Sequence, residues 1–336
     1  TLVIDEFQDF ERVNPSIFSD IQNLWDKYSP QAKINFIVCG SIYSLMKHIF
    51  EDRKEPLFGR LTSKFILKPF KTSVLIEIMQ EYNPAFTPED LLCLYTLTGG
   101  VAKYVSLLID AGAFTKDSMI DFVTQSDSPL LTEGKDMLIQ EFGRDYSTYF
   151  SILQLVASGC TRQSEIDSII GKNSGPYLKN LSEDYSLIQR QLPLLAKPGT
   201  RNLRWFMSDN FLNFWFRFIY PHQSAIELEK YGQLNEYIKS HYVQYSGWML
   251  EKYFREIVAE TMNVTQVGNY WDTKGENEID LIALNDFEKR GVVAEVKRNP
   301  NKISYTLLAE KVAPLPKEFT KYNLSQKGFS LEDMTK

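Results

Sequence analysis

The stretch NEIDLIALNDFEKRGVVAEVKRN (residues 277–299) carries the most informative pattern in the chain. Two apolar runs flank the turn-forming residues NDFEKRG, which predicts a β-hairpin. Side chains alternate between the two faces of a strand, so Glu295 and Lys297 should point the same way. On the partner strand, Asp280 should lie near Glu295 across the hairpin. The stretch therefore predicts two carboxylates and one lysine at a single spot.

This combination of side chains suits metal-dependent cleavage of phosphodiester bonds. Carboxylates are the hard oxygen ligands that Mg²⁺ prefers, and the metal polarises the phosphate and lowers the pKa of a bound water. The lysine can position that water or stabilise the developing negative charge. A preceding helix, SGWMLEKYFREIVAE (246–260), offers Glu251 as a further metal ligand, with Glu256 as the alternative. The same residues are also compatible with a domain that serves structure or holds DNA without cutting it.

The arrangement D-x(14)-E-x-K, with a helix carboxylate before it, resembles the PD-(D/E)xK nuclease superfamily. The resemblance implies a restriction-endonuclease-like α/β domain over residues 246–336. It also implies that Glu251, Asp280 and Glu295 bind Mg²⁺, and that Glu295 and Lys297 are catalytic.

Upstream, residues 131–210 predict three helices followed by a two-stranded wing. The strands LIQRQLP and LRWFMSD can pair around the turn KPGTRN. In such a winged helix-turn-helix the third helix often enters the major groove of DNA. The candidate DNA-contacting residues are Tyr177, Lys179 and Asn180 on that helix and Arg201 and Arg204 on the wing, with Lys197 also in reach of phosphates. The alternative is a packing or protein-interaction module.

The segment between these two domains, residues 211–245, is rich in aromatic residues at helical spacing. Packing between domains explains this composition better than a platform on which bases stack. We therefore expect an aromatic helical linker.

At the start of the chain, TLVIDEFQDF (1–10) is an apolar run that ends in Asp5 and Glu6. Such a run predicts a strand buried on both faces, as in a parallel sheet. Carboxylates at its carboxyl end lie where α/β folds bind ligands. In a P-loop ATPase, Asp5 would help to hold the Mg²⁺ of the nucleotide, and Glu6 would activate the attacking water. A second strand, INFIVCGS (34–41), would place Ser41 as a sensor of the γ-phosphate.

A loop and a further strand follow. The loop KEPLFGR (54–60) presents Arg60, which is a candidate arginine finger for a neighbouring subunit and thus for self-association. The alternatives are a phosphate contact within its own subunit and an ordinary surface salt bridge. KFILKPF (64–70) predicts a third strand.

The segments TLVIDEFQDF, VCGSIYSLM, PLFGR and LTGGVAKYV, in that order, resemble the archaeal-type, STAND-related group of AAA+-like ATPases. The resemblance implies ATP and Mg²⁺ as ligands, part of a P-loop ATPase core over residues 1–70 and a helical lid over residues 71–130. The 336 residues contain no GxxxxGK[ST] motif, the element that cradles the phosphates. We therefore expect the chain to be the C-terminal part of a longer protein and to bind ATP weakly or not at all by itself.

The composition is that of an ordinary globular protein, with 43% hydrophobic and 24% charged residues. The net charge of −6 argues against a generic polyanion binder, so any DNA contact must come from a local patch. There is no apolar run of the length that predicts a membrane helix, and the three scattered cysteines fit a reduced, cytoplasmic setting. The expected fold is multidomain, α/β plus α+β. The expected function is an ATP-dependent, DNA-binding protein with an Mg²⁺-dependent nuclease domain. The alternatives are a non-cleaving ATP-dependent switch and a protein-interaction module.

Overall fold

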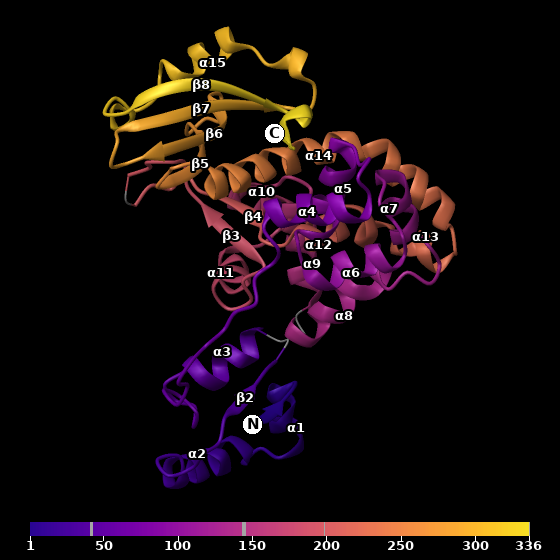
Figure 1. Cartoon of the computed structure of the whole chain (residues 1–336), viewed down its shortest axis with the longest axis vertical. Helices are drawn as coiled ribbons and strands as arrows, with labels where there is room; N and C mark the ends of the chain where they lie inside the picture. The colour runs from indigo at the N-terminus through magenta and orange to yellow at the C-terminus, as the bar shows by residue number, and fades with distance from the viewer. Residues whose placement is uncertain (41–42, 143–145, 198, 336) are drawn as a thin grey trace.

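The computed structural model describes residues 1–40, 43–142, 146–197 and 199–335. It shows a mixed α/β protein in which an N-terminal unit, a helical body and a C-terminal sheet follow one another along the chain (Figure 1). The helical body lies between the other two parts, so the N-terminal unit and the C-terminal sheet occupy opposite ends of the long axis (Figure 1).

The N-terminal unit is built on two short parallel strands. β1 (Leu2–Ile4) pairs with β2 (Phe36–Val38), with Leu2 opposite Phe36. The helices of this unit are α1 (Phe10–Val13), α2 (Ile17–Tyr28) and α3 (Tyr43–Glu51), with the 3₁₀ turn η1 (Phe7–Asp9) after β1. A small core holds them together and consists of Phe7, Phe18, Ile49 and Leu57.

This unit buries less than the sequence predicts. Leu2 and Val3 of β1 expose 48% and 58% of their surface, so the strand is not buried on both faces. Residues 64–70 form no strand, and Phe65 and Leu67 expose 90% and 96%. A sheet of two short strands offers too little surface to cover apolar side chains on both of its faces.

The helical body follows and begins with α4 (Thr72–Tyr82), α5 (Pro88–Thr98), α6 (Ala102–Asp110), α7 (Lys116–Val123) and α8 (Leu130–Phe142). Helix α5 begins at a capping box, in which the Thr87 hydroxyl accepts from the Asp90 amide and the Asp90 carboxylate accepts from the Thr87 amide. It ends at Gly99, whose left-handed backbone is typical of a helix C-terminus. Every residue of α5 from Asp90 onward is buried, so this helix forms the centre of the body.

Three further helices and a strand pair come next, in the order that the sequence predicts. The helices are α9 (Tyr146–Ala157), α10 (Gln163–Ile170) and α11 (Gly175–Glu183). β3 (Ile188–Gln191) pairs antiparallel with β4 (Arg204–Met207). We refer to β3, β4 and the described residues between them (192–197 and 199–203) as the β3–β4 hairpin.

The aromatic segment forms core. It comprises α12 (Asn210–Phe214), the π-helix η3 (Trp215–Ile219), the 3₁₀ turn η4 (Tyr220–His222) and α13 (Gln223–Glu227). Its rings are buried and pack on one another, as expected for a packing segment; they include Phe211, Phe214, Trp215, Phe216 and Phe218. Helix α14 (Tyr231–Thr261) then runs without a break across residues 245 and 246, where the sequence suggested a domain boundary.

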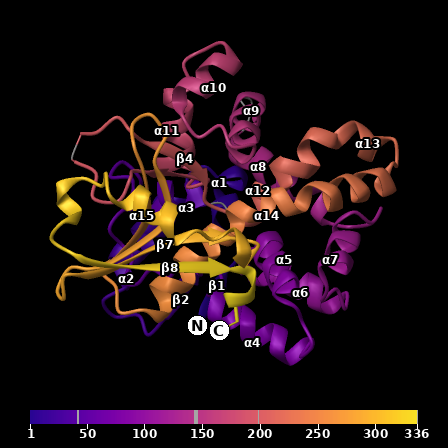
Figure 2. The same ribbon diagram turned by 90° about the horizontal axis from the view of Figure 1, so that it is seen from above.

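The C-terminal sheet contains β5 (Gln266–Trp271), β6 (Glu278–Asn285), β7 (Arg290–Lys297) and β8 (Asn323–Ser330), in that spatial order. The first three strands are antiparallel, and β8 pairs parallel with β7 after the crossover helix α15 (Tyr305–Val312). Short 3₁₀ turns occur at η5 (Pro300–Lys302), η6 (Lys317–Phe319) and η7 (Leu331–Asp333). The sheet lies between α14 and α15 (Figure 1). Helix α14 begins beside α13, at the far side of the molecule, and runs to the sheet (Figure 2).

The turn between α5 and α6 gives a first prediction. Gly100 has a φ of +80°, its carbonyl accepts from the Phe70 amide at 2.7 Å, and an added Cβ would overlap the Phe70 carbonyl oxygen. Gly100→Ala should lower the free energy of unfolding by the left-handed strain of about 1–2 kcal/mol and by a further 1–3 kcal/mol, roughly, for the overlap. Urea unfolding followed by circular dichroism measures the loss.

Gly112→Ala is the matched control. Gly112 also has a positive φ, of +64°, but nothing lies within 4 Å of an added Cβ. This variant should lose only the strain, about 1–2 kcal/mol. Equal losses in the two variants would show that the contact between Gly100 and Phe70 is not tight.

Acid sensitivity of the sheet gives a second prediction. Hydrogen bonds from Tyr322, Gln266 and Thr265 lower the pKa of Asp286 to about 2. Because this pKa is lower in the folded state than in the unfolded chain, the contribution to stability is full above pH 4 and is lost as the pH falls towards 2. Asp286→Asn should therefore melt at a lower temperature than the parent at pH 7, and the difference should shrink as the pH falls from 4 through 2. A constant difference across this range would contradict the role given to Asp286.

Candidate functional site

A carboxylate–lysine cluster, which we define as Asp280, Glu295 and Lys297, lies at one end of the C-terminal sheet where β6 begins and β7 ends. Lys297 Nζ lies 3.0 Å from Asp280 Oδ2 and 3.5 Å from Glu295 Oε1. Leu281 pairs with Ala294 in the antiparallel ladder, and this register places Asp280 opposite Glu295. The structure thus brings together the three side chains that the sequence predicts to meet across the hairpin.

Neighbouring groups hold Glu295 in its ionised form. Its Oε2 accepts from the Ser304 amide at 3.0 Å, and Lys311 Nζ of α15 lies 3.5 Å from its Oε1. Burial favours a raised pKa for Glu295, but the Ser304 amide, Lys297 and Lys311 outweigh burial and hold this pKa below its usual value. Glu295 is therefore a carboxylate at neutral pH.

Asp280 and Lys297 form the second half of the cluster. Asp280 Oδ2 also accepts from the Val296 amide at 2.9 Å, so the hairpin backbone fixes this carboxylate. Burial favours a lowered pKa for Lys297, but Asp280 and Glu295 raise it overall. Lys297 therefore stays protonated, and a single ammonium group bridges two carboxylates.

Glu251 approaches the cluster from α14. Burial, and then the charge of Asp280, raise the pKa of Glu251 to about 7, against the opposing effects of Arg255 and Lys297. Arg255, one turn further along α14, lies 3.8 Å from Glu251 Oε2 and donates to the Asp280 carbonyl at 3.0 Å. Glu256, the alternative ligand from the sequence, lies 4.0 Å from Lys252 instead.

The chemistry of these side chains fits a hard divalent cation such as Mg²⁺, which takes one or two carboxylates and completes its shell with water and phosphate oxygens. In the described part of the chain, no three or more His, Cys, Asp or Glu residues are grouped so that they could hold a metal ion. Glu251, Asp280 and Glu295 thus do not form a ready three-carboxylate site. The Lys297 ammonium group contacts both Asp280 and Glu295, so an ion shared by these two would have to displace it.

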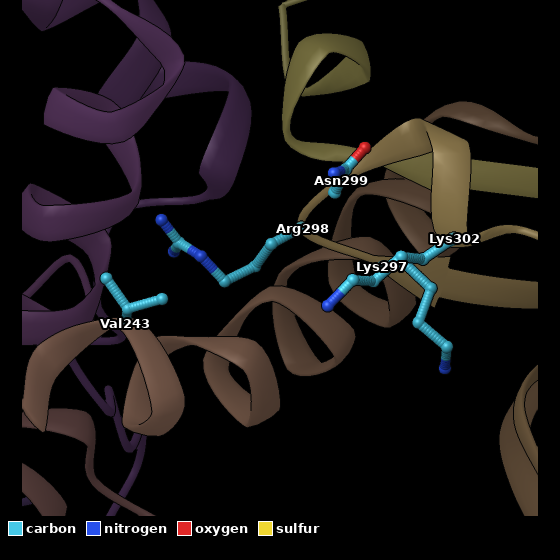
Figure 3. Close-up of a pocket in the computed structure, with 5 residues that line it drawn as sticks. All are labelled: Val243, Lys297, Arg298, Asn299 and Lys302. Carbon is cyan, nitrogen blue, oxygen red and sulfur yellow. The ribbon is translucent and has the colours of Figure 1, made fainter.

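Two cavities adjoin the cluster. A cleft of 670 Å³ lies between α14, the β3–β4 hairpin and the strands β5 and β6, and its lining includes Trp248, Glu251, Arg255 and Asp280. A second cavity of 440 Å³, which we call the basic pocket, is lined by Val243, Lys297, Arg298, Asn299 and Lys302 (Figure 3). Asp280 faces the cleft and Lys297 faces the basic pocket, so their ion pair separates the two.

In the N-terminal unit, Asp5 and Glu6 follow β1 directly. The Phe7 amide donates to the Cys39 carbonyl at 2.9 Å, so these carboxylates lie beside the end of the parallel strand β2. Glu6 has a φ of 47°, which is uncommon for a residue other than glycine, and its Oε2 accepts from Gln8 Nε2 at 2.5 Å. Ser41, the proposed sensor, lies outside the described residues.

Arg60 is held within its own unit. Its Nε and Nη2 donate to the two carboxylate oxygens of Asp26 at 2.9 and 2.7 Å, and its Nη1 donates to the carbonyls of Pro56 and Phe58. This arrangement is that of the surface salt bridge considered for Arg60. Its use as an arginine finger stays a prediction.

The proposed DNA-contacting residues differ in burial and in the contacts they make. Tyr177 packs against the Tyr149 ring, and Asn180 Nδ2 donates to the Tyr149 hydroxyl at 3.1 Å. Arg204 is mostly buried, forms an ion pair with Glu278 and stacks on Trp271. Lys179 and Arg201 are exposed, and Lys179 lies 3.8 Å from Glu183.

Sequence reasoning missed three residues of the site: Arg255, Ser304 and Lys311. Arg255 could have been found, because it lies four residues after Glu251 and such pairs share one helix face. Ser304 and Lys311 contact Glu295 only because α15 packs on the sheet, and no local sequence pattern predicts this packing.

The geometry defines a multidomain α/β protein with a carboxylate–lysine cluster at the end of an antiparallel hairpin. Residues 215–306 match the family DUF234, described as archaeal and bacterial proteins of unknown function. The chain is 33% identical over 310 residues to the uncharacterized protein MJECL04 of Methanocaldococcus jannaschii, with 88% of this chain and 67% of that protein covered. The chain therefore belongs to the same family as MJECL04.

Among solved structures, the chain is similar to the Walker-type ATPase PABY2304 of Pyrococcus abyssi. The TM-score is 0.45 at 16% identity, and the match covers 64% of this chain and 62% of that one. Within the ranges that the structure describes, no helix has the length and apolar character needed to cross a membrane.

The titration of Glu251 gives a third prediction. Its pKa of about 7 should fall in Asp280→Asn, because that substitution removes the neighbouring negative charge. A carboxyl whose pKa is raised on folding stabilises the folded state at low pH, and this contribution is lost as the pH rises through 7. Carbon-13 NMR of labelled glutamate side chains measures the shift.

Glu288→Gln, in the exposed turn of the same hairpin, is the control and should leave the titration of Glu251 unchanged. If Glu251 already titrated near 4.5 in the parent protein, the burial and the proximity to Asp280 described above would be wrong.

Proposed function

We propose that α14 and the C-terminal sheet form an Mg²⁺-dependent nuclease domain that cleaves DNA. The observation that carries the proposal is the Lys297 ammonium group held between the carboxylates of Asp280 and Glu295. One cation and two anions at the end of a hairpin, beside two cavities, supply both the metal ligands and the charge stabilisation that phosphodiester cleavage requires.

Each side chain has a role in this proposal. Asp280, together with Glu251 or Glu295, would hold the Mg²⁺, which would polarise the phosphate and lower the pKa of a bound water. Lys297 is protonated at neutral pH, so it would neutralise charge on the phosphate rather than accept a proton. When the substrate binds, the ammonium group would give up a contact with one carboxylate oxygen and donate to a phosphate oxygen instead. Glu251, with a pKa of about 7, can take up or release a proton near neutral pH.

We propose that the three helices α9 to α11 and the β3–β4 hairpin form a winged helix that contributes to DNA binding. Lys179 and Arg201 are the residues best placed for this, because both are exposed. Asn180 and Tyr177 pack on Tyr149 within the three helices, and Arg204 attaches the β3–β4 hairpin to the C-terminal sheet. The effect of these three residues on DNA would be indirect.

A cleavage assay gives the fourth prediction. The chain should cleave DNA with Mg²⁺ and not with EDTA, and Asp280→Asn should reduce the rate roughly 100-fold or more, since even outer partners of metal ligands cost 10–100-fold when removed. Lys297→Met should give a loss of about 10²–10³-fold through missing charge stabilisation. Separation of labelled single-stranded and duplex DNA on denaturing gels measures both.

Glu288→Gln, which removes an exposed carboxylate from the same hairpin, should cut at the parental rate. Cleavage that survived in both Asp280→Asn and Lys297→Met would refute the assignment of the site. DNA binding without any cleavage by the parent chain would favour the non-cleaving switch, and absence of binding at low salt would favour a protein-interaction module.

We propose in addition that the N-terminal unit belongs to an ATPase. Supporting this, β1 and β2 are parallel, and Asp5 and Glu6 leave β1 at the edge where parallel sheets bind ligands. Asp5 would help to bind the Mg²⁺ of ATP, and Glu6 would act on the attacking water. The phosphate-binding loop would have to come from outside the 336 residues, which contain no GxxxxGK[ST] motif.

The test uses a protein that contains this chain together with such a loop. Glu6→Gln should reduce ATP hydrolysis about 10²–10⁴-fold while ATP still binds, because the amide keeps the size of the side chain. Glu11→Gln, an exposed carboxylate in α1, should hydrolyse ATP normally. Normal hydrolysis by Glu6→Gln would remove Glu6 from the proposal.

A further inference from the structure

We infer that the site takes single-stranded rather than duplex nucleic acid, with a base on Trp248 in the cleft and the backbone continuing into the basic pocket. The inference rests on the nuclease function proposed above. It names the substrate class and adds a binding residue, Trp248, that takes no part in the chemistry.

The first observation is the shape of the space in front of the carboxylates. Glu251 and Asp280 line a cleft of 670 Å³, which falls in the range of about 300–1,000 Å³ that takes small ligands. A DNA duplex, whose major groove alone is about 12 Å wide, does not fit into such a space. A single strand can enter it one nucleotide at a time.

The second observation is that the cleft has a fixed wall. The β3–β4 hairpin is attached to β5 by the Leu194 amide, which donates to the Asn269 carbonyl at 2.9 Å. Asn202 and Trp271 exchange two hydrogen bonds of 3.1 and 3.2 Å. Arg204 adds an ion pair to Glu278 and lies over the Trp271 ring at 4.7 Å. These contacts hold the hairpin against the sheet, so a duplex would have to break them before it could reach Asp280.

The third observation is an aromatic side chain at the cleft. Trp248 lines the cleft, is 48% exposed and lies on α14 three residues before Glu251, on the same helix face. The indole is supported from one side: a Cβ added to Gly159 would lie 3.0 Å from its Cη2 atom. Exposed aromatic rings next to a phosphate-handling site are the usual platforms on which the bases of single strands stack.

The fourth observation is the basic pocket beyond the cluster. Lys297, Arg298 and Lys302 line it (Figure 3). Lys297 and Arg298 are themselves paired with carboxylates, whereas Lys302 is exposed. Because the Asp280–Lys297 ion pair lies between this pocket and the cleft, a strand that presents its phosphate to the cluster would continue towards Lys302. A substrate that fills both cavities must be longer than one nucleotide.

Binding is tested without cleavage, by fluorescence anisotropy of labelled DNA in EDTA. The parent chain should bind a (dT)12 strand more tightly than a blunt duplex of the same length, and thymidine monophosphate should compete poorly with the strand. Trp248→Ala should weaken strand binding roughly 5- to 150-fold, the worth of one stacked base, and Trp248→Phe should restore most of it. Phe287→Ala, which removes an 89% exposed ring from the β6–β7 turn, is the control and should bind as the parent does.

The salt dependence of strand binding tests the basic pocket. Lys302→Gln should reduce the slope of log affinity against log salt concentration by about 0.7, the value for one phosphate contact of a single strand. An unchanged slope would remove the pocket from the path of the strand.

These outcomes separate the inference from the function on which it rests. Tighter binding of the duplex, full strand binding by Trp248→Ala, or equal competition by thymidine monophosphate would overturn the inference and leave the nuclease proposal standing. Preferential strand binding that depends on Trp248, found in a chain that never cleaves, would support the inference for the binding site while the nuclease proposal failed.

Discussion

The structure depends on the continuity of α14. Its 31 residues span about 46 Å at 1.5 Å per residue, and it packs against α4, α5 and α7 of the helical body as well as the strands β5 to β7. At its carboxyl end, the Glu260 carboxylate accepts from the amides of Thr72 and Ser73 at the start of α4, where a negative charge is favourable. Since Glu251 lies on the same helix, the site and the body share one continuous element.

A second connection fixes the end of β7. Arg298 follows Lys297 in the chain; it donates to the Ser246 hydroxyl on α14 at 2.6 Å and forms an ion pair with Glu89 on α5. The cluster is part of a wider ion network, which also includes Glu251, Arg255 and Lys311. Partly buried ion networks of this kind seldom stabilise a fold more than apolar residues of the same volume would. The cleft reaches Glu251, Arg255 and Asp280, and the basic pocket reaches Lys297, which favours a functional role over a structural one.

The sequence predicted the hairpin and its three charged side chains because strand alternation and a short turn determine which residues face each other. It also predicted the order of helices and strands from residue 146 to residue 207. It could not predict Ser304 and Lys311 at Glu295, because these contacts depend on how α15 crosses the sheet. The sequence also could not predict that Leu2 is exposed or that residues 64–70 form no strand. An apolar run is buried only when a partner surface is available.

The N-terminal unit touches the helical body at contacts that a nucleotide-dependent change could use. Lys47 of α3 donates to the Glu183 carbonyl at the end of α11 at 2.6 Å. Phe70 lies just before α4, and its amide donates to the carbonyl of Gly100, which lies between α5 and α6. The first contact reaches the helix proposed to meet DNA, and the second reaches the segment that Glu260 of α14 caps. If Asp5 and Glu6 serve an ATPase, a shift of their unit would therefore act on both the proposed winged helix and the helix that carries Glu251.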